Sequence, residues 1–401
     1  MPASTAPRLL DGAAPAALER ARALEFEQLA EAVQRSGLRG RGGAGFPFAE
    51  KLRAVRRNAQ GGPAYLVANG YDADPASPLS RALLTRNAAN VIDGIAIAAH
   101  AVGATEAFLY LHPEAAQARE AAARTIAEQA SALGVEIEIA LGPGGFMGGE
   151  ESAMLNVLES RRAMARQRPP YPAAQGLRLR PTLVASVETL SWLPLIVQEQ
   201  ARANTKLVSV TGAVARPGVY EVTLGTQLSA ILDEGGGTTG KLKGIHVGGP
   251  TGGILAASRT DTRFDFDDLR VAGTHMGSAQ VRAVPAGTCI VNEAAKLFAY
   301  LAKENCAICV PCRVGTKRVH GILESAYSGL GRESDLAWLD ELGTHMERFS
   351  LCGFGITAPS ILRTTMREFP DDYRIHIREK RCPEGTCTPV RSRRYETMVQ
   401  P

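Results

Sequence analysis

Four cysteines have a spacing that suits an iron–sulfur cluster. Cys306, Cys309 and Cys312 are separated by two residues each, and Cys352 lies 40 positions after the third. A [4Fe–4S] cluster takes one thiolate for each iron, so a close triplet and one remote thiolate can hold it. Zinc also accepts four thiolates, but its sites usually combine two pairs. Buried, inert thiols are the simplest alternative, and three within seven positions make the cluster the better interpretation.

Two glycine-rich segments have the composition of loops that hold a phosphorylated cofactor. Residues 37–45 contain five glycines together with Arg39 and Arg41. Glycines allow backbone N–H groups to crowd around an anion and the arginines add charge, so a phosphate site is favoured over a flexible loop. The second segment, 142–149, precedes Glu150 and Glu151 at the start of an expected helix. There a carboxylate either offsets the helix dipole or faces a bound cofactor.

The composition is that of a globular protein with more than one domain. The chain has 401 residues, of which 45% are hydrophobic and 21% charged, which predicts two or three domains. Its net charge of +4 comes from dispersed residues and does not indicate nucleic-acid binding. All seven cysteines follow position 288, and the sequence shows neither a signal-peptide core nor a membrane span. This favours metal sites in a reducing compartment over disulfides.

The first two hundred residues alternate between helical and strand patterns. Apolar spacing predicts a helix over 15–35, and residues 64–69 have the pattern of a buried strand. Further helices are expected at 88–103, 114–133 and 153–162, with strands at 107–111 and 135–140. This alternation predicts an α/β layer built on a largely parallel sheet.

The pattern changes twice after residue 204. Short strand patterns at 206–210, 218–222 and 244–247, with a helix at 228–233, predict a small α+β module. The later part is helical and predicts a small bundle that grips the cluster. Its expected helices span 294–303, 313–325, 335–348 and 359–368. The tail from Arg391 is basic and expected to be mobile.

Further motifs join these segments into a recognisable set. They are the 37–47 loop, Gly149-Glu150-Glu151-Ser152-Ala153, Arg168-Pro169-Pro170-Tyr171-Pro172, Pro181-Thr182, Val187-Glu188-Thr189-Leu190 and the four cysteines. With them the chain resembles the flavoprotein NADH-binding subunit of respiratory complex I and related subunits of NAD-linked hydrogenases and formate dehydrogenases. The resemblance runs from about Gly37 to Cys387.

The resemblance implies a fold and a set of cofactors. It implies an FMN-binding α/β domain over 1–204, a small α+β β-grasp (SLBB) domain over 205–288, an iron–sulfur helical bundle over 289–370 and a cysteine-containing tail over 371–401. In that family FMN lies on the glycine loop, NADH stacks on the flavin, and a [4Fe–4S] cluster takes electrons one at a time.

The resemblance also implies roles for particular residues. By position, the catalytic residues would be Glu150 and Tyr171. The residues around FMN would be Gly40, Arg41, Gly42, Gly43, Lys51, Asn69, Gly149 and Glu150. The residues beside the nucleotide would be Phe46, Asp72, Asp74, Arg168 and Tyr171.

Some positions depart from the family pattern where relatives contact the nucleotide or the flavin. Relatives carry Asp, Glu and Glu where this chain has Tyr71, Asp72 and Asp74, and an aromatic expected a few positions after Lys51 is Ala54. A shortened carboxylate loses a hydrogen bond worth roughly 1–3 kcal/mol, and a lost aromatic stack about 1 kcal/mol. FMN is therefore expected. NADH oxidation stays the expectation for the family, with NADH binding weak or absent compared with relatives.

Cys289, His376, Cys382 and Cys387 remain once the cluster is assigned. Three thiolates and one imidazole can make a closed zinc site, and some hydrogenase-type relatives resemble the chain here. The alternative is that the last two cysteines are loosely placed thiols in a mobile tail.

The resemblance implies a diaphorase-like oxidoreductase subunit, which passes electrons from NAD(P)H through FMN and a [4Fe–4S] cluster to a partner protein. Two alternatives stay open, an electron relay that has lost nucleotide binding and a non-redox scaffold subunit. The expected partners are other redox subunits, ferredoxin-like or thioredoxin-like iron–sulfur proteins. The chain is expected to be cytoplasmic, with any attachment to a membrane complex made through its partners.

Overall fold

The computed structural model describes residues 9–387 except positions 13, 15 and 200. The chain divides into two compact units, one made of residues 1–208 with 219–224 and the other of 209–218 with 225–401. The basic tail from Arg391, expected to be mobile, lies outside the described residues.

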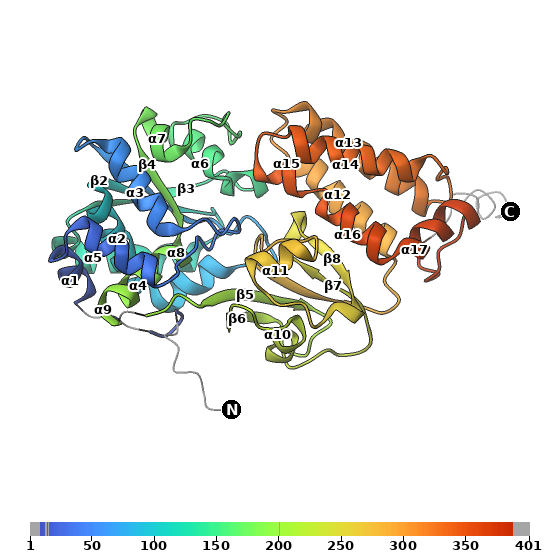
Figure 1. Cartoon of the computed structure of the whole chain (residues 1–401), viewed down its shortest axis with the longest axis horizontal. Coiled ribbons are helices and arrows are strands. Elements are labelled where there is room, and N and C mark those ends of the chain that lie inside the picture. The colour runs from blue at the N-terminus through green and yellow to red at the C-terminus, as the bar shows by residue number, and fades with distance from the viewer. Residues whose placement is uncertain (1–8, 13, 15, 200, 388–401) are drawn as a thin grey trace. The chain divides into compact units, whose positions relative to one another are not determined.

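A four-stranded parallel sheet is the framework of the first unit (Figure 1). Its order is β3-β2-β1-β4, and every neighbouring pair is parallel. The strands are β1 (Ala64–Gly70), β2 (Ala104–Leu111), β3 (Glu136–Leu141) and β4 (Thr182–Ser186). The predicted α/β layer is confirmed. The sequence analysis did not predict β4, whose nearly continuous burial gives no alternating pattern.

Two long helices connect the strands of this sheet. Helix α4 (Leu79–Val102) joins β1 to β2, and α5 (Ala116–Leu133) joins β2 to β3. Helix α4 begins before the predicted bounds 88–103 because it contains a kink, at which Asn87 has non-helical φ and ψ. The sequence pattern revealed only the part after the kink. Further helices are α3 (Phe48–Ala59), η1 (Phe146–Gly149), α6 (Glu151–Leu158), α7 (Pro172–Gln175), η2 (Leu177–Leu179), α8 (Val187–Leu190) and α9 (Trp192–Glu199).

The predicted helix over 15–35 is two helices, α1 (Ala17–Arg22) and α2 (Phe26–Arg35). The break lies at Glu25, whose backbone is extended. Glu25 and Gln28 form a reciprocal capping box, which satisfies free N–H groups and starts a new helix. A local cap has therefore overridden the continuous apolar spacing.

A second sheet has the order β6-β5-β9-β7-β8. Strand β5 pairs parallel with β9, whereas β7 pairs antiparallel with β9 and β8. This is the mixed module that the sequence predicts, with β8 and β9 added to the three expected strands. Its elements are β5 (Thr205–Gly212), β6 (Gly218–Thr223), α10 (Leu228–Glu234), β7 (Leu242–Val247), η3 (Gly249–Thr251), β8 (Gly253–Ala256), η4 (Ala257–Arg259), α11 (Phe266–Val271) and β9 (Gln280–Pro285).

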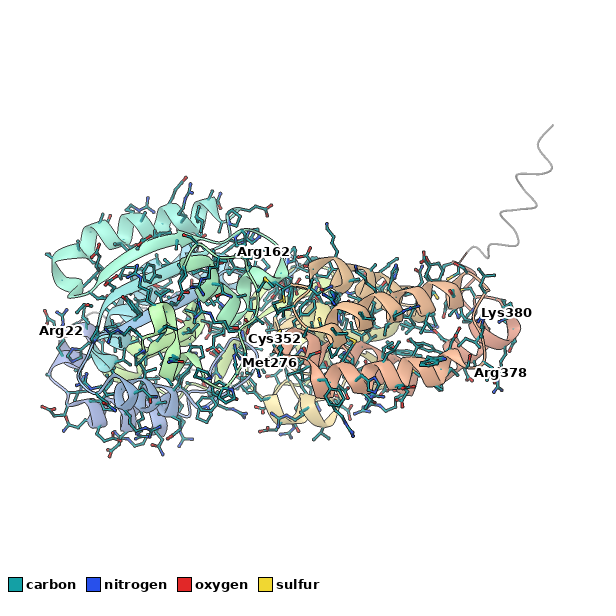
Figure 2. All side chains as sticks on the ribbon, turned by 90° about the horizontal axis from the view of Figure 1, so that it is seen from above. Arg22, Arg162, Met276, Cys352, Arg378 and Lys380 are labelled. Carbon is teal, nitrogen blue, oxygen red and sulfur yellow. The ribbon has the colours of Figure 1, made fainter. Side chains whose placement is uncertain are left out.

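The chain after Cys289 is helical, and the four predicted helices are present. Figure 2 shows Cys352 at one end of this helical region and Arg378 and Lys380 at the other. The two cysteine sets therefore lie at opposite ends of it. The helices are α12 (Ile290–Glu304), α13 (Val310–Tyr327), α14 (Asp335–Phe349), α15 (Gly353–Thr357), α16 (Ser360–Glu368), α17 (Pro370–Arg374) and the π-helical turn η5 (Ile375–Glu379). Within the described part of the chain, every helix is too short or too polar to cross a membrane.

Candidate functional site

The carboxyl ends of β1 and β4 define a site in the first unit. In the order β3-β2-β1-β4, the strands that follow β1 in the chain, β2 and β3, lie on one side of β1. Strand β4 lies on the other side of β1. A parallel sheet whose connections change direction in this way has a ligand-binding crevice outside those strand ends. Asn69 and Ser186 are paired at the two ends and mark the position expected for a cofactor.

Asn69 joins β1 to the second glycine-rich segment. Its amide nitrogen donates to the Gly149 carbonyl at 3.1 Å, and its Oδ1 accepts from the N–H of Tyr71 at 3.1 Å. The amide nitrogen thus holds the 142–149 segment against the end of β1, while Oδ1 fixes the main chain that follows β1. Two elements that the sequence predicts for cofactor binding meet here.

The first glycine-rich loop closes on itself. The N–H of Gly40 donates to the Phe46 carbonyl at 2.8 Å, and Arg39 Nε donates to the Gly45 carbonyl at 2.7 Å. Gly45 has a φ of 67°, which favours glycine. These contacts fix a hairpin-like loop ahead of α3, so the glycines here form a defined structure.

The centre of this loop lies beside the end of β4. Arg41 is buried, its N–H donates to Thr189 Oγ1 at 2.8 Å, and its guanidinium donates to the Ala203 carbonyl at 2.6 Å. A Cβ added to Gly42 would meet Ser186 Cβ at 3.9 Å, an ordinary contact. The protein itself therefore has room for a Cβ at Gly42, so a substitution at this position can test whether a ligand binds there.

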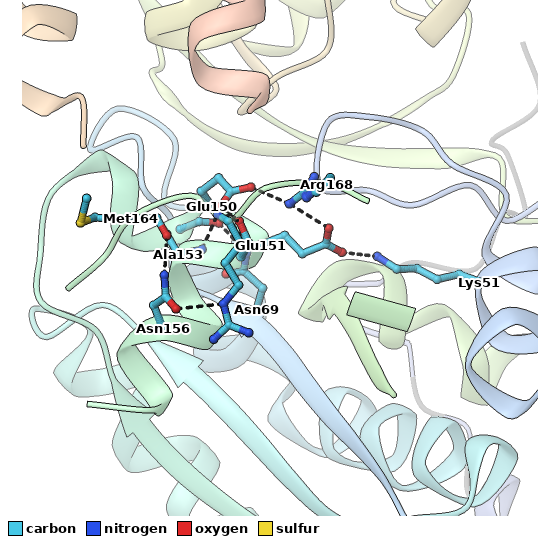
Figure 3. A network of polar contacts seen from close by, with 11 residues as sticks. Lys51, Asn69, Glu150, Glu151, Ala153, Asn156, Met164 and Arg168 are labelled. Atoms are coloured by element: carbon cyan, nitrogen blue, oxygen red, sulfur yellow. Dashed lines mark hydrogen bonds and ion pairs between the residues drawn. The ribbon is translucent and has the colours of Figure 1, made fainter. Parts of the chain in front are cut away.

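Glu150 is fixed at the N-terminus of α6 (Figure 3). Its Oε2 accepts hydrogen bonds from the N–H groups of Ser152 and Ala153 at 2.9 and 2.8 Å, and its Oε1 contacts Arg168 Nη2 at 2.7 Å. This cap explains why α6 begins before the predicted 153–162 helix. The helix-dipole role of Glu150 and its position near the strand ends are therefore compatible.

Glu151 connects Arg168 to Lys51 (Figure 3). Its carboxylate lies 2.6 Å from Lys51 Nζ and 3.2 Å from Arg168 Nη2. Burial alone would raise the pKa of Glu151, but the nearby charges of Lys51 and Arg168 outweigh it and lower that pKa. The carboxylate therefore stays ionised, and α3, α6 and the segment carrying Arg168 are joined by charge.

Two aromatic side chains near these groups are exposed. Phe46 is 56% exposed and Tyr171 is 60% exposed. They precede α3 and α7, and these two helices pack against each other. Rings left at the surface in this way are available to stack on a planar ligand.

Tyr71, in contrast, belongs to the core. It is 1% exposed and its ring stacks on Tyr110 with 5.3 Å between the centroids. A Cβ on Gly148 would lie 2.3 Å from the Tyr71 hydroxyl oxygen, and one on Gly142 would lie 2.4 Å from its ring. The 142–149 segment is therefore glycine-rich in part because Tyr71 packs against it, a reason that composition alone does not reveal.

The two shortened acidic side chains bind backbone amides. The oxygens of Asp72 accept from the N–H groups of Ser80 and Arg81, both at 2.8 Å, at the first turn of α4. Burial raises the pKa of Asp72 to about 6. Asp74 is 4% exposed and accepts from the N–H of Ala76 at 3.0 Å. Both carboxylates that the resemblance places beside the nucleotide are thus turned into the protein.

The four cysteines of the predicted cluster come together in the second unit. Cys309 and Cys352 immediately precede α13 and α15, and Cys312 lies in the first turn of α13. A Cβ on Gly355 would lie 3.0 Å from Cys312 Cβ, so α15 packs directly on the start of α13. Burial, with the charges of Cys309, Cys352 and Cys306, raises the pKa of Cys312. Ionised thiolates in this place require a cationic group between them.

The chemistry of these four side chains fits an iron–sulfur cluster. A [4Fe–4S] cluster takes one thiolate on each of its four irons. Cys309 and Cys312 lie at the start of α13, Cys306 lies three residues earlier, and Cys352 lies at the start of α15. The Cys306, Cys309, Cys312 and Cys352 donor set therefore fits a [4Fe–4S] cluster.

Cys289, His376, Cys382 and Cys387 form a compact group. The fold brings Cys289 Sγ to 3.3 Å from His376 Nε2 and 3.4 Å from Cys387 Sγ, although 87 positions separate Cys289 from the histidine. A hydrogen bond from Cys387 and burial raise the pKa of Cys289 to about 12. A bound divalent cation would favour the thiolate instead, so the donor set fits one zinc ion.

Known families match these same segments. The family described as Nuo51 FMN-binding domain matches residues 33–194, and the SLBB domain family matches 207–255. The family described as NADH-ubiquinone oxidoreductase-F iron-sulfur binding region matches 292–376. The class is thereby defined as a protein with an FMN-binding domain, an SLBB domain and a [4Fe–4S]-binding region, as the sequence motifs predict.

Known proteins match most of this chain. The F 2 subunit of the NADH-quinone oxidoreductase of Rhizobium meliloti is 33% identical over 89% of this chain and 90% of its own. The HndC subunit of the NADP-reducing hydrogenase of Solidesulfovibrio fructosivorans is 33% identical over 90% of this chain and 78% of its own. A crystal structure of an NAD+-reducing [NiFe]-hydrogenase in the H2-reduced state superposes with a TM-score of 0.82 at 31% identity, over 99% of this chain and 70% of that one. The chain belongs to the family of the NADH-quinone oxidoreductase F subunits and their hydrogenase relatives.

The structure gives a role to Thr189, which the sequence analysis placed in the Val187-Glu188-Thr189-Leu190 motif. Its hydroxyl lies 2.8 Å from that of Ser186 and accepts a hydrogen bond from the main-chain N–H of Arg41. Sequence reasoning missed Tyr110, which packs against Tyr71. Tyr110 comes from β2 and has no local signal.

Proposed function

We propose that this chain passes electrons from NAD(P)H through FMN and a [4Fe–4S] cluster to a partner protein. The observation that carries the proposal is the convergence at the ends of β1 and β4. The two glycine-rich segments meet Asn69 there, beside a charged network that consists of Lys51, Glu151, Arg168 and Glu150. The same chain also brings four cysteines together. A non-redox scaffold would need neither group of residues.

Bound FMN would supply the conversion of a two-electron donor into single-electron steps. The proposed roles of the chain's own residues are to bind, to orient and to hold charge. Glu150, fixed by two backbone N–H groups and Arg168, and the exposed ring of Tyr171 are the proposed catalytic pair. The residues proposed to surround FMN are Gly40, Arg41, Gly42, Gly43, Lys51, Asn69, Gly149 and Glu150. Those proposed beside the nucleotide are Phe46, Arg168 and Tyr171; Asp72 and Asp74, which the resemblance also implies there, are turned into the protein.

The nucleotide half of the proposal is tested by anaerobic titration. Micromolar NADH or NADPH added to the purified chain should bleach the flavin absorbance, with dithionite as the control for full reduction. Hydride transfer needs the donor within about 3–3.5 Å of its acceptor, so weak or misplaced binding is detected as a loss of rate. Flavin that dithionite reduces but millimolar NADH and NADPH leave oxidised would show that neither nucleotide is the donor.

The buried Tyr71 and the inward-facing Asp72 and Asp74 favour a second candidate, an electron relay between two proteins without nucleotide binding. Restoring the family pattern should then create NADH oxidation. The combined change Asp72→Glu, Asp74→Glu and Ala54→Phe is expected to raise the rate of flavin bleaching at least about tenfold, because it returns hydrogen bonds and a stack worth a few kcal/mol. Asp371→Glu, at a side chain 76% exposed, is the matched control and should change nothing. Rapid bleaching of the parent's flavin by micromolar NADH would contradict the relay interpretation.

We also propose one structural zinc ion held by Cys289, His376, Cys382 and Cys387. Their ligand atoms lie within 4.8 Å of one another, which supports a single tetrahedral ion. Metal analysis should find about one zinc per chain, and Cys382→Ser should lose it while the absorbance of the cluster survives. Protein that is free of zinc yet fully stable would disprove this site.

The proposed partners are other redox subunits, ferredoxin-like or thioredoxin-like iron–sulfur proteins, since the relatives are themselves named as subunits. We propose a cytoplasmic location, with any membrane attachment made through those partners. The proposed domains are the FMN domain over 1–204, the SLBB domain over 205–288, the iron–sulfur bundle over 289–370 and the cysteine-containing segment over 371–401.

A further inference from the structure

Three of the four ligands in the Cys289 set come from one short stretch of chain. His376 lies in η5, and Cys382 and Cys387 lie in the turn that follows, which closes through a hydrogen bond from the Gly385 N–H to the Cys382 carbonyl at 3.1 Å. His376 Nδ1 is 2.6 Å from the carbonyl of Asp372 in α17. The position of the imidazole therefore depends on α17, and the position of the two thiols depends on the 382–387 turn.

Lys243 of β7 contacts both of these parts. Its Nζ lies 2.6 Å from Glu384 Oε1, in the turn between the two cysteines, and 3.2 Å from Asp372 in α17. The side chains of Lys243, Asp372 and Glu384 are 20%, 10% and 22% exposed, so the ammonium bridges two partly buried carboxylates. Its ammonium also lies over the ring of Phe369, with Nζ 5.8 Å from the ring centroid. One cation of the SLBB sheet thus joins α17, whose Asp372 carbonyl contacts His376, to the turn that carries the two cysteines.

The charges around Lys243 explain how this contact can support the metal site. Three thiolates and a neutral imidazole around Zn²⁺ leave a net charge of about −1. The carboxylates of Asp372 and Glu384 add two further negative charges next to it. Without the ammonium these carboxylates would lose the contact that joins α17 to the 382–387 turn.

We propose that Lys243 is a positioning residue of the metal site, which holds His376 and the 382–387 turn at ligand distance and slows the release of the ion. This inference rests on the zinc ion proposed above. It makes the SLBB sheet part of the metal site, although β7 supplies no ligand. Residues beyond the ligands commonly change metal affinity by roughly 10–100-fold.

The test compares zinc release from three variants of the full-length chain. Zinc-loaded protein is mixed with excess EDTA, and the zinc that remains bound is measured over time. Lys243→Met should release zinc about tenfold faster than the parent. Lys243→Arg should release it at nearly the parental rate, because a guanidinium can still bridge both carboxylates. Lys241→Met, at an exposed lysine two positions earlier, should leave the rate unchanged.

A double-mutant cycle separates this role from a general loss of stability. Glu384→Gln should also speed release, and adding it to Lys243→Met should have little further effect, because the two side chains act through one contact. Retained cluster absorbance shows that each variant is folded. Equal rates for Lys243→Met and the parent would overturn the role of Lys243 and leave the zinc site standing. A parent chain that binds no zinc would overturn both proposals.

Discussion

Replacing Cys352 with serine should reduce the iron content from about four atoms per chain to three or fewer and remove the absorbance of the [4Fe–4S] cluster. Cys352 is buried and lies 40 positions after Cys312, so it ties α15 to the start of α13. Loss of the cluster should therefore also lower the melting temperature of the helical region, because a bound metal group stabilises the segments that it connects. Iron analysis and thermal denaturation measure the two effects.

The control for this change is Cys382→Ser, a second cysteine of the same helical region. It lies at the opposite end from Cys352 and is proposed to bind zinc, so its replacement should leave the iron content unchanged. An unaltered iron content in Cys352→Ser would contradict the assignment of the fourth ligand. Equal loss of iron in both variants would show that the effect is general instability.

The second large effect is expected at Gly42. Gly42→Val should release FMN from the purified protein. The valine side chain would occupy the space beside Ser186 in which the flavin is proposed to bind. Forcing extra carbon atoms into a filled site costs about 1–3 kcal/mol, which corresponds to a roughly tenfold to hundredfold loss of affinity. The flavin content after gel filtration measures the result.

The structure makes this prediction specific to the ligand. A Cβ at Gly42 meets only an ordinary contact within the protein, so the variant should fold. Gly240→Val is the matched control, because a Cβ there meets nothing within 4 Å and the position lies outside the FMN domain. Stoichiometric flavin in Gly42→Val would remove the loop from the proposed FMN site.

Much of this site could be predicted because its signals are local in the sequence. The cysteine triplet, the glycine loops and the Glu150–Glu151 pair each lie within a few residues, and each has chemistry that few other arrangements share. The strand–helix alternation likewise predicts the parallel sheet. The order β3-β2-β1-β4, which places Asn69 beside Ser186, depends on β4 and could not be derived from spacing.

The unpredicted features depend on contacts between distant segments. Tyr71 is a core residue because Tyr110 and the glycines at 142 and 148 surround it, and Asp72 caps α4 because the chain turns inward there. A comparison of sequences shows only that this chain has a tyrosine where its relatives have an acidic residue. The bridge from Lys243 to Glu384 spans 141 positions and has no sequence signature.

Electron transfer between the flavin and the cluster of one chain tests the central claim most directly. The anaerobic protein is reduced stepwise with NADH and then with dithionite, and each sample is followed by flavin absorbance and by electron paramagnetic resonance at low temperature. The account predicts that the signal of a reduced [4Fe–4S] cluster appears in the parent chain as the flavin is reduced, and that Cys352→Ser lacks it while its flavin still bleaches. A parent chain whose flavin is fully reduced by dithionite without any iron–sulfur signal would contradict the account.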